Sequence, residues 1–115
     1  MMQFHLPIRA VLYKDGGDWI AHCLEFDLVG DGPTPPDALK RLGEAIEIQI
    51  KASIKHKNPD NLFTPADGKY FRMFAAGKNT ALGKLTIKPV DEVNIEEIET
   101  REYSDSDSDC ELVPA

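Results

Sequence analysis

The fold is decided by the stretch LPIRAVLYKDGGDWIAHCLE, residues Leu6–Glu25. Apolar residues alternate with others along Leu6–Tyr13 and again along Asp18–Glu25. This period of two is typical of strands, and Lys14–Gly17 between them contains an Asp-Gly turn signal. The stretch therefore predicts a β-hairpin.

After the hairpin, Phe26–Gly32 is short and ends in glycine, which predicts a third antiparallel strand. A helix start follows, because Thr34 can cap, Pro35 suits the first helical position and Asp37 complements the helix dipole. The apolar spacing predicts a long helix from Asp37 to about Lys57. Its core-facing stripe consists of Leu39, Leu42, Ile46 and Ile50, widened by Ala38, Ala45, Ile48 and Ile54.

Three further elements are expected in the second half of the chain. Lys69–Ala76, which contains four large apolar or aromatic residues, predicts a short amphipathic helix that Gly77 ends. Lys84–Val90 alternates as a further strand, and Val93–Tyr103 fits either a bulged strand or a helix, of which we favour the strand. The expected fold class is α+β: a three-stranded antiparallel sheet covered by a long helix and extended by one or two C-terminal strands.

Length and charge divide the chain into unequal parts. The 115 residues allow one domain, expected over residues 1–90, with an additional strand in 91–103 and an acidic, disordered tail in 104–115. The net charge is −7, but residues 91–115 alone contribute −9, from ten acids and Arg101. This sign argues against nucleic acid as the main ligand. The tail is either a solvated segment that aids solubility or a contact for a basic partner.

The sequence predicts a cytoplasmic protein without a membrane segment. The N-terminus lacks the features of a signal peptide, and no apolar run approaches the roughly 20 residues that span a bilayer. Cys23 lies in an apolar stretch and Cys110 in the acidic tail, so both are expected to be free thiols.

Candidate catalytic chemistry is sparse. The three histidines, His5, His22 and His56, have no metal-ligand spacing, and no phosphate-binding or nucleophile motif is present, so no cofactor and no metal are expected. Three carboxylates surround the third strand: Glu25, Asp27 and Asp31. They can do acid–base work or hold magnesium, but a charged strand margin explains them more simply. A small enzyme built on Glu25, Asp27 and His22 is the minor alternative to a protein that is not an enzyme.

Four stretches carry turn, cap and helix motifs: Gly17-Asp-Trp-Ile-Ala21, Leu24–Gly32, Thr34-x-x-Asp-Ala38 and Glu44-Ala-Ile46. Together they resemble HicB-type antitoxin domains, and the likeness covers about residues 6–57. The resemblance implies a partial RNase H-like fold, in which a helix packs on three antiparallel strands that a further strand joins. It also implies binding and neutralisation of a small basic messenger-RNA-cleaving toxin of the HicA type.

The chain departs from the HicB pattern at two places. Leu24–Val29 replaces the Pro-Asp-Leu-Pro-Gly-Cys-like stretch that is common after the second strand. Many family members repress their own operon through a C-terminal DNA-binding segment, whereas residues 91–115 are acidic where contacts to phosphate need lysine and arginine. This difference argues against operator DNA binding.

Two hypotheses for function follow. In the first, the chain is an antitoxin-like protein that neutralises a basic toxin by contact, with Glu25, Asp27 and Asp31 as the candidate partner-binding residues. In the second, it is an orphan oligomeric structural or regulatory module of the same fold that uses Tyr70–Phe74 as a subunit contact. A homodimer or higher homo-oligomer is expected under both, because an open sheet leaves unpaired edges.

Overall fold

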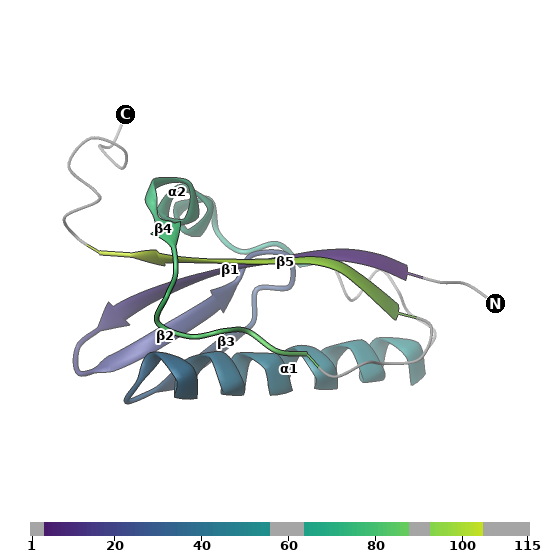
Figure 1. The fold of residues 1–115 in the computed structure, drawn as a ribbon. Coiled ribbons are helices and arrows are strands. Elements are labelled where there is room, and N and C mark those ends of the chain that lie inside the picture. Colours follow the sequence, from purple (N-terminus) through teal and green to yellow (C-terminus); the bar gives the residue numbers. More distant parts are fainter. Residues whose placement is uncertain (1–3, 56–63, 88–92, 105–115) are drawn as a thin grey trace.

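In the part of the chain that the structure describes, five strands form one mixed sheet between two helices (Figure 1). The structure is a computed structural model that describes residues 4–55, 64–87 and 93–104. The order across the sheet is β3-β2-β1-β5-β4. The elements are β1 (Phe4–Asp15), β2 (Asp18–Cys23), β3 (Val29–Gly32), α1 (Pro35–Lys55), α2 (Gly68–Ala76), β4 (Lys78–Asn79) and β5 (Val93–Tyr103).

The predicted hairpin and third strand are present as an antiparallel unit. β1 pairs with β2, with Ala10 opposite Cys23 and Asp15 opposite Asp18, and β2 pairs in turn with β3. The third strand begins at Val29 and not at Phe26, as the sequence suggested. Residues 24–26 form a turn, and Asp27 has a φ of 51°, a left-handed conformation that a strand does not accommodate.

The predicted capped helix is confirmed as α1, and one residue predicted for its core-facing stripe is exposed. The Thr34 hydroxyl accepts a hydrogen bond from the Asp37 backbone N–H at 3.3 Å and donates one to the Asp37 carboxylate at 2.8 Å. Ile48 is 68% exposed, so its predicted place in the core-facing surface is wrong. It belongs to the solvent side of α1, beside exposed Lys51. The predicted end near Lys57 lies outside the described residues.

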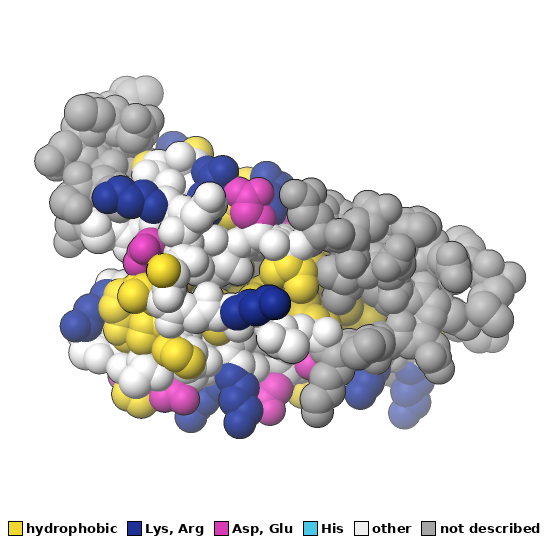
Figure 2. All heavy atoms as spheres, viewed as in Figure 1, with side chains coloured by type: hydrophobic (Ala, Val, Ile, Leu, Met, Phe, Trp, Pro, Cys, Tyr) yellow, Lys and Arg dark blue, Asp and Glu magenta, His cyan; other side chains and the backbone are white. Residues whose placement is uncertain are grey.

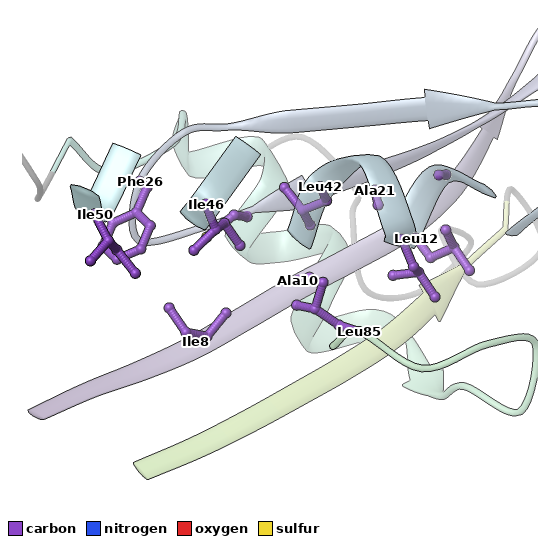
Figure 3. Close-up of a cluster of buried hydrophobic side chains, with 12 residues drawn as sticks. Ile8, Ala10, Leu12, Ala21, Phe26, Leu42, Ile46, Ile50 and Leu85 are labelled. Carbon is purple, nitrogen blue, oxygen red and sulfur yellow. The ribbon is translucent and has the colours of Figure 1, made fainter. Parts of the chain in front are cut away.

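The main core lies between α1 and one face of the sheet (Figure 3). The helix approaches β3 so closely that a Cβ atom added to Gly30 would lie 2.3 Å from the backbone nitrogen of Leu42. Glycine at this position therefore allows the helix and strand backbones to touch. The buried cluster consists of Ile8, Ala10, Leu12, Ala21, Cys23, Phe26, Ala38, Leu39, Leu42, Ile46, Ile50 and Leu85.

The C-terminal half departs from the expected strands at one point. Val93–Tyr103 does form a strand, β5, which pairs in parallel with β1. The strand expected over Lys84–Val90 is wrong for residues 84–87, which form no strand, and residues 88–90 lie outside the described part. Leu85 and Ile87 still point into the core, because this segment packs against α1. The contact is close at Gly43, where an added Cβ atom would lie 2.4 Å from the Thr86 carbonyl oxygen.

The short predicted helix is present as α2 and covers the opposite face of the sheet from α1 (Figure 1). The Asp67 side chain caps it by accepting a hydrogen bond from the Lys69 N–H at 3.1 Å. A second buried cluster lies beneath α2 and contains Val11, Leu24, Ala66 and Phe74.

The predictions for the acidic tail and Cys110 fall on residues outside the described ranges. Among those ranges, no helix has both the length and the apolar character that crossing a bilayer requires.

Candidate functional site

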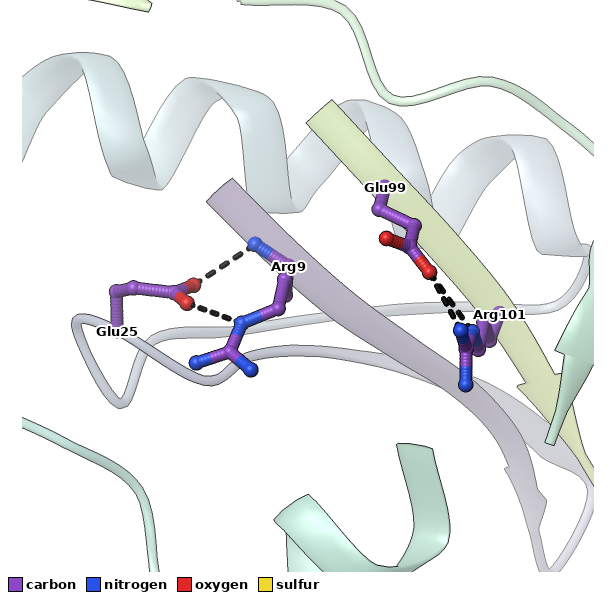
Figure 4. Close-up of polar contacts among 4 residues, drawn as sticks. All are labelled: Arg9, Glu25, Glu99 and Arg101. Carbon is purple, nitrogen blue, oxygen red and sulfur yellow. Dashed lines mark hydrogen bonds and ion pairs between the residues drawn. The ribbon is translucent and has the colours of Figure 1, made fainter. Parts of the chain in front are cut away.

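Two of the predicted carboxylates lie in different environments. Glu25 accepts hydrogen bonds from the backbone N–H and the Nε of Arg9, both at 2.7 Å (Figure 4). Its side chain is 11% exposed, so this carboxylate is a part of the folded structure. Asp31 lies on β3, where its carboxylate is 3.5 Å from the Arg41 guanidinium and is 57% exposed. Asp31 therefore stays accessible to a partner, whereas Glu25 is largely enclosed.

The third carboxylate, Asp27, is paired with a buried histidine. His22 Nε2 lies 2.7 Å from Asp27 Oδ1, and the His22 side chain is 5% exposed. The imidazole ring packs against the Tyr70 ring of α2 with centroids 3.9 Å apart. Within the described residues, His22 Nδ1 has no hydrogen-bond partner. His22 thus links the segment between β2 and β3 to α2 through Asp27 and Tyr70. These contacts give the His22–Asp27 pair a structural role.

Two arginines hold α2 against β1 and β5. The Arg9 guanidinium lies 5.4 Å from the centre of the Phe71 ring, and the Arg101 guanidinium lies 4.5 Å from that of Phe74. Arg101 also donates a hydrogen bond to the Phe74 carbonyl at 3.1 Å and pairs with Glu99 at 2.8 Å (Figure 4). Because cation–π contacts and charge-assisted hydrogen bonds act together here, the aromatic side of α2 is used within the chain.

An open groove of about 310 Å³ lies where the parallel strands β1 and β5 end. Tyr13 and Tyr103 are register neighbours on these strands, and Trp19 is opposite Lys14 in the hairpin. Tyr13 stacks on Tyr70 with ring centroids 6.2 Å apart, and burial, followed by the adjacent Tyr70, raises the pKa of Tyr13. The groove is lined by Tyr13, Lys14, Trp19, Met73, Tyr103 and Ser104.

Cys23 is a free thiol, as the sequence predicted, and it lies in the core. It is fully buried beneath α1, on the face opposite to its neighbour His22. Burial raises the pKa of its thiol to about 12, so the thiol stays protonated at neutral pH and is a poor nucleophile. Among the residues described, no group of three His, Cys, Asp or Glu side chains is placed to hold a metal ion.

The sequence grouped His22 with Asp27 only in the minor enzyme alternative and gave no sign of their hydrogen bond, and it did not predict the groove. The backbone of Asp27, between β2 and β3, is left-handed, which turns the Asp27 side chain back toward His22. The sequence carries only a weak signal for that conformation. The groove depends on the parallel pairing of β1 with β5, which no local pattern encodes. Alternation placed Tyr13 and Tyr103 on strands, but not on neighbouring ones.

Three comparisons with known proteins gave no relative: no family model, no curated protein and no solved structure matches the chain. The function proposed below therefore rests on the residues, on their geometry and on the resemblance of the turn and cap motifs.

Proposed function

We propose that this chain is an antitoxin-like, protein-binding module that neutralises a small basic messenger-RNA-cleaving toxin by direct contact. The observation that carries the proposal is the strand order β3-β2-β1-β5. Three antiparallel strands are followed by a helix on one face and then by β5, parallel to β1. The partial RNase H-like fold that the HicB resemblance implies has three antiparallel strands, a packed helix and a further strand, and the observed elements are compatible with it. The motifs that carry the resemblance lie on these elements or on the turns between them.

The distribution of charge supports a basic partner. Residues 91–115 hold ten acids and one arginine, whereas residues 1–90 have a net charge of +2. β5 lies within this acidic part of the sequence, and Ser104, which follows β5, lines the groove. Electrostatic attraction would speed association with a basic toxin and make the complex sensitive to salt.

In this proposal the module acts by covering the toxin and carries out no chemistry of its own. The carboxylates Glu25 and Asp27 serve the fold through Arg9 and His22, which leaves Asp31 as the predicted contact that remains open to a partner. The charge of residues 91–115 also disfavours contact with DNA phosphates.

The alternative, an orphan oligomeric module, has one observation in its favour. β4 pairs with β5 only at Glu102 and Arg101, so along residues 93–99 the outer edge of β5 has no strand partner among the described residues. An open edge can pair with a second copy of the chain. Light scattering of the full chain tests the oligomeric module: a strictly monomeric mass would exclude it, whereas an oligomeric mass fits both proposals.

The antitoxin proposal is tested by co-expression. The full chain is used as bait at low salt, and a small basic protein that it retains and that high salt releases is identified by mass spectrometry. That protein is then expressed alone and together with the chain. We expect growth inhibition when it is alone and relief when both are present. Continued inhibition despite an excess of the chain would contradict the proposal.

A further inference from the structure

The outer edge of β5 is paired over only a part of its length. On its inner side, β5 runs parallel to β1 from end to end. On its outer side, β4 pairs with it at Glu102 and Arg101, and the Thr80 N–H donates a hydrogen bond to the Thr100 carbonyl at 3.3 Å (Figure 1). Over residues 93–99, no strand in 4–55, 64–87 or 93–104 adjoins this edge. Within those ranges, this stretch of β5 is therefore an open edge.

The backbone of the open edge presents groups that can form hydrogen bonds. The Thr100 carbonyl binds Thr80 on the side away from β1, so it points outward. Backbone groups two residues apart in a strand point to the same side, so the N–H and the carbonyl of Ile98 also face the open edge. The Ile98 side chain is 40% exposed. Outward backbone groups beside an exposed apolar side chain form a template for a further strand.

The charge of β5 selects the kind of strand that can be added. Its one base, Arg101, pairs with Glu99 at 2.8 Å. Neighbouring strands lie about 4.8 Å apart, so every charge in the open stretch is close to an added strand, whichever face of the sheet it lies on. The sequence of β5 contains four glutamates, the first three of them in the open stretch: Glu96, Glu97, Glu99 and Glu102.

These glutamates distinguish between two possible occupants of the edge. A second copy of β5 would bring its own glutamates against them, and like charges on adjacent strands destabilise the pair. A strand that carries lysine or arginine would meet opposite charges instead. The occupant that fits the edge is therefore an extended basic segment.

We propose that the open edge of β5, residues 93–99, binds an extended lysine- or arginine-rich segment of a protein partner as an added strand. The backbone supplies the hydrogen bonds, and the glutamates select the basic side chains. The inference goes beyond the proposed function, because β3 with Asp31 lies on the other side of β1 from this edge. It applies to any partner that presents such a segment.

A labelled peptide tests the proposal. The full chain is titrated at low salt into a fluorescein-labelled peptide of alternating lysine and valine, and the anisotropy is followed. One control peptide has proline in place of valine, which keeps the charge but removes backbone N–H groups. A second has glutamate in place of lysine. We expect saturable binding of the lysine–valine peptide that weakens as salt is raised, and about tenfold weaker binding of both controls. Equal binding of either control would overturn the proposal.

Matched variants locate the binding. The double variant Glu96→Gln with Glu97→Gln should bind the lysine–valine peptide about fivefold more weakly than the unaltered chain. The control, Asp15→Asn with Asp18→Asn, removes two exposed carboxylates at the hairpin end of β1 and should bind as the unaltered chain does. Circular dichroism verifies that each variant is folded. Equal weakening in the two double variants would contradict the assignment to β5.

A third variant tests the backbone of the edge. Ile98→Pro removes the N–H that faces outward, and proline is tolerated in an edge strand at such a position. We expect this variant to lose the lysine–valine peptide, and unchanged binding would overturn the proposal. Sedimentation of the full chain tests the other occupant. If the chain self-associates and Ile98→Pro makes it monomeric, the edge pairs with a second copy and the proposal fails.

Discussion

The face of the sheet under α1 is filled mainly with aliphatic side chains, together with Phe26 (Figure 3). The face under α2 instead carries aromatic rings, buried His22 and the two arginines Arg9 and Arg101 (Figure 4). α1 has 21 residues and buries a continuous stripe, whereas α2 has 9 residues and buries only Phe74. Aliphatic burial is the larger source of stability. The comparison shows that the first face supplies most of the buried apolar area, whereas the second holds a short helix through aromatic, cationic and hydrogen-bonded contacts.

The surface view agrees with this division. Hydrophobic side chains gather at the end of the molecule where the hairpin and the start of α1 lie, below α2 (Figure 2). Charged side chains of both signs are distributed over the rest of the visible described surface (Figure 2).

The largest expected effect comes from the α1 face. Ile46 is fully buried, so Ile46→Ala should lower the free energy of unfolding by about 3 kcal/mol, measured by urea denaturation. Phe74→Ala should instead release α2 while the rest of the sheet persists, because this short helix has a single buried anchor. Amide exchange would then speed up in α2 and not in α1. An equal loss of global stability in both variants would erase the difference between the faces.

The second expected effect tests the histidine beneath α2. Asp27→Ala removes the partner of His22 Nε2 and places alanine at a φ of 51°, so we expect a loss of about 2 kcal/mol in the free energy of unfolding. Asp27→Asn retains an acceptor and suits a left-handed backbone, and it should cost less than half as much. If the two variants were equally stable in thermal melts, the hydrogen bond to His22 would have no structural role.

The third effect compares an enclosed ion pair with an open one. Glu25→Gln weakens two hydrogen bonds with Arg9 and should cost about 1.5 kcal/mol of stability. Asp31→Asn breaks a pair in which both side chains are more than half exposed, and the change should stay below about 0.5 kcal/mol. Chemical denaturation of both variants side by side measures the difference. A cost for Asp31→Asn as large as that for Glu25→Gln would reverse the ranking.

The smallest effect is a pH dependence from the α1 face. Burial raises the pKa of Cys23 from 9.0 to about 12, so above pH 9 the unfolded chain loses this proton more readily than the folded chain. Stability is therefore complete below pH 9 and falls above it, by about 1 kcal/mol at pH 10. The raised pKa of Tyr13 acts in the same direction at higher pH. Cys23→Ala should flatten the decline between pH 8 and 10, and an unchanged slope would contradict the assignment to Cys23.

Local signals made much of the fold predictable. The Asp-Gly turn specified the hairpin, and Thr34 and Asp37 specified the start of α1, because each feature depends on residues close in sequence. The alternation of residues 84–87 predicted a strand, and this prediction was wrong. Leu85 and Ile87 do point inward, but the backbone of this segment packs against α1 and does not join the sheet. Alternation reports which side chains are buried, but not whether the backbone has a strand partner.

The candidate site was less predictable than the fold. Glu25, Asp27 and Asp31 were chosen for their charge, but the first two have partners that only the folded chain brings to them, Arg9 and His22. The groove is formed by residues as distant in sequence as Tyr13 and Tyr103, which are neighbours through the parallel pairing of β1 and β5. Such a pairing is non-local, so a single sequence gives it no periodic signature.

The most direct test of the central claim, that the chain binds a small basic protein by direct contact, is amide hydrogen exchange with peptide-level mass spectrometry. The full chain is measured alone and in complex with the small basic protein that it neutralises. The account predicts slower exchange in the peptides that contain Asp31 of β3, the predicted contact that stays exposed, with the interior of α1 unchanged. Unchanged exchange throughout the described residues would contradict it.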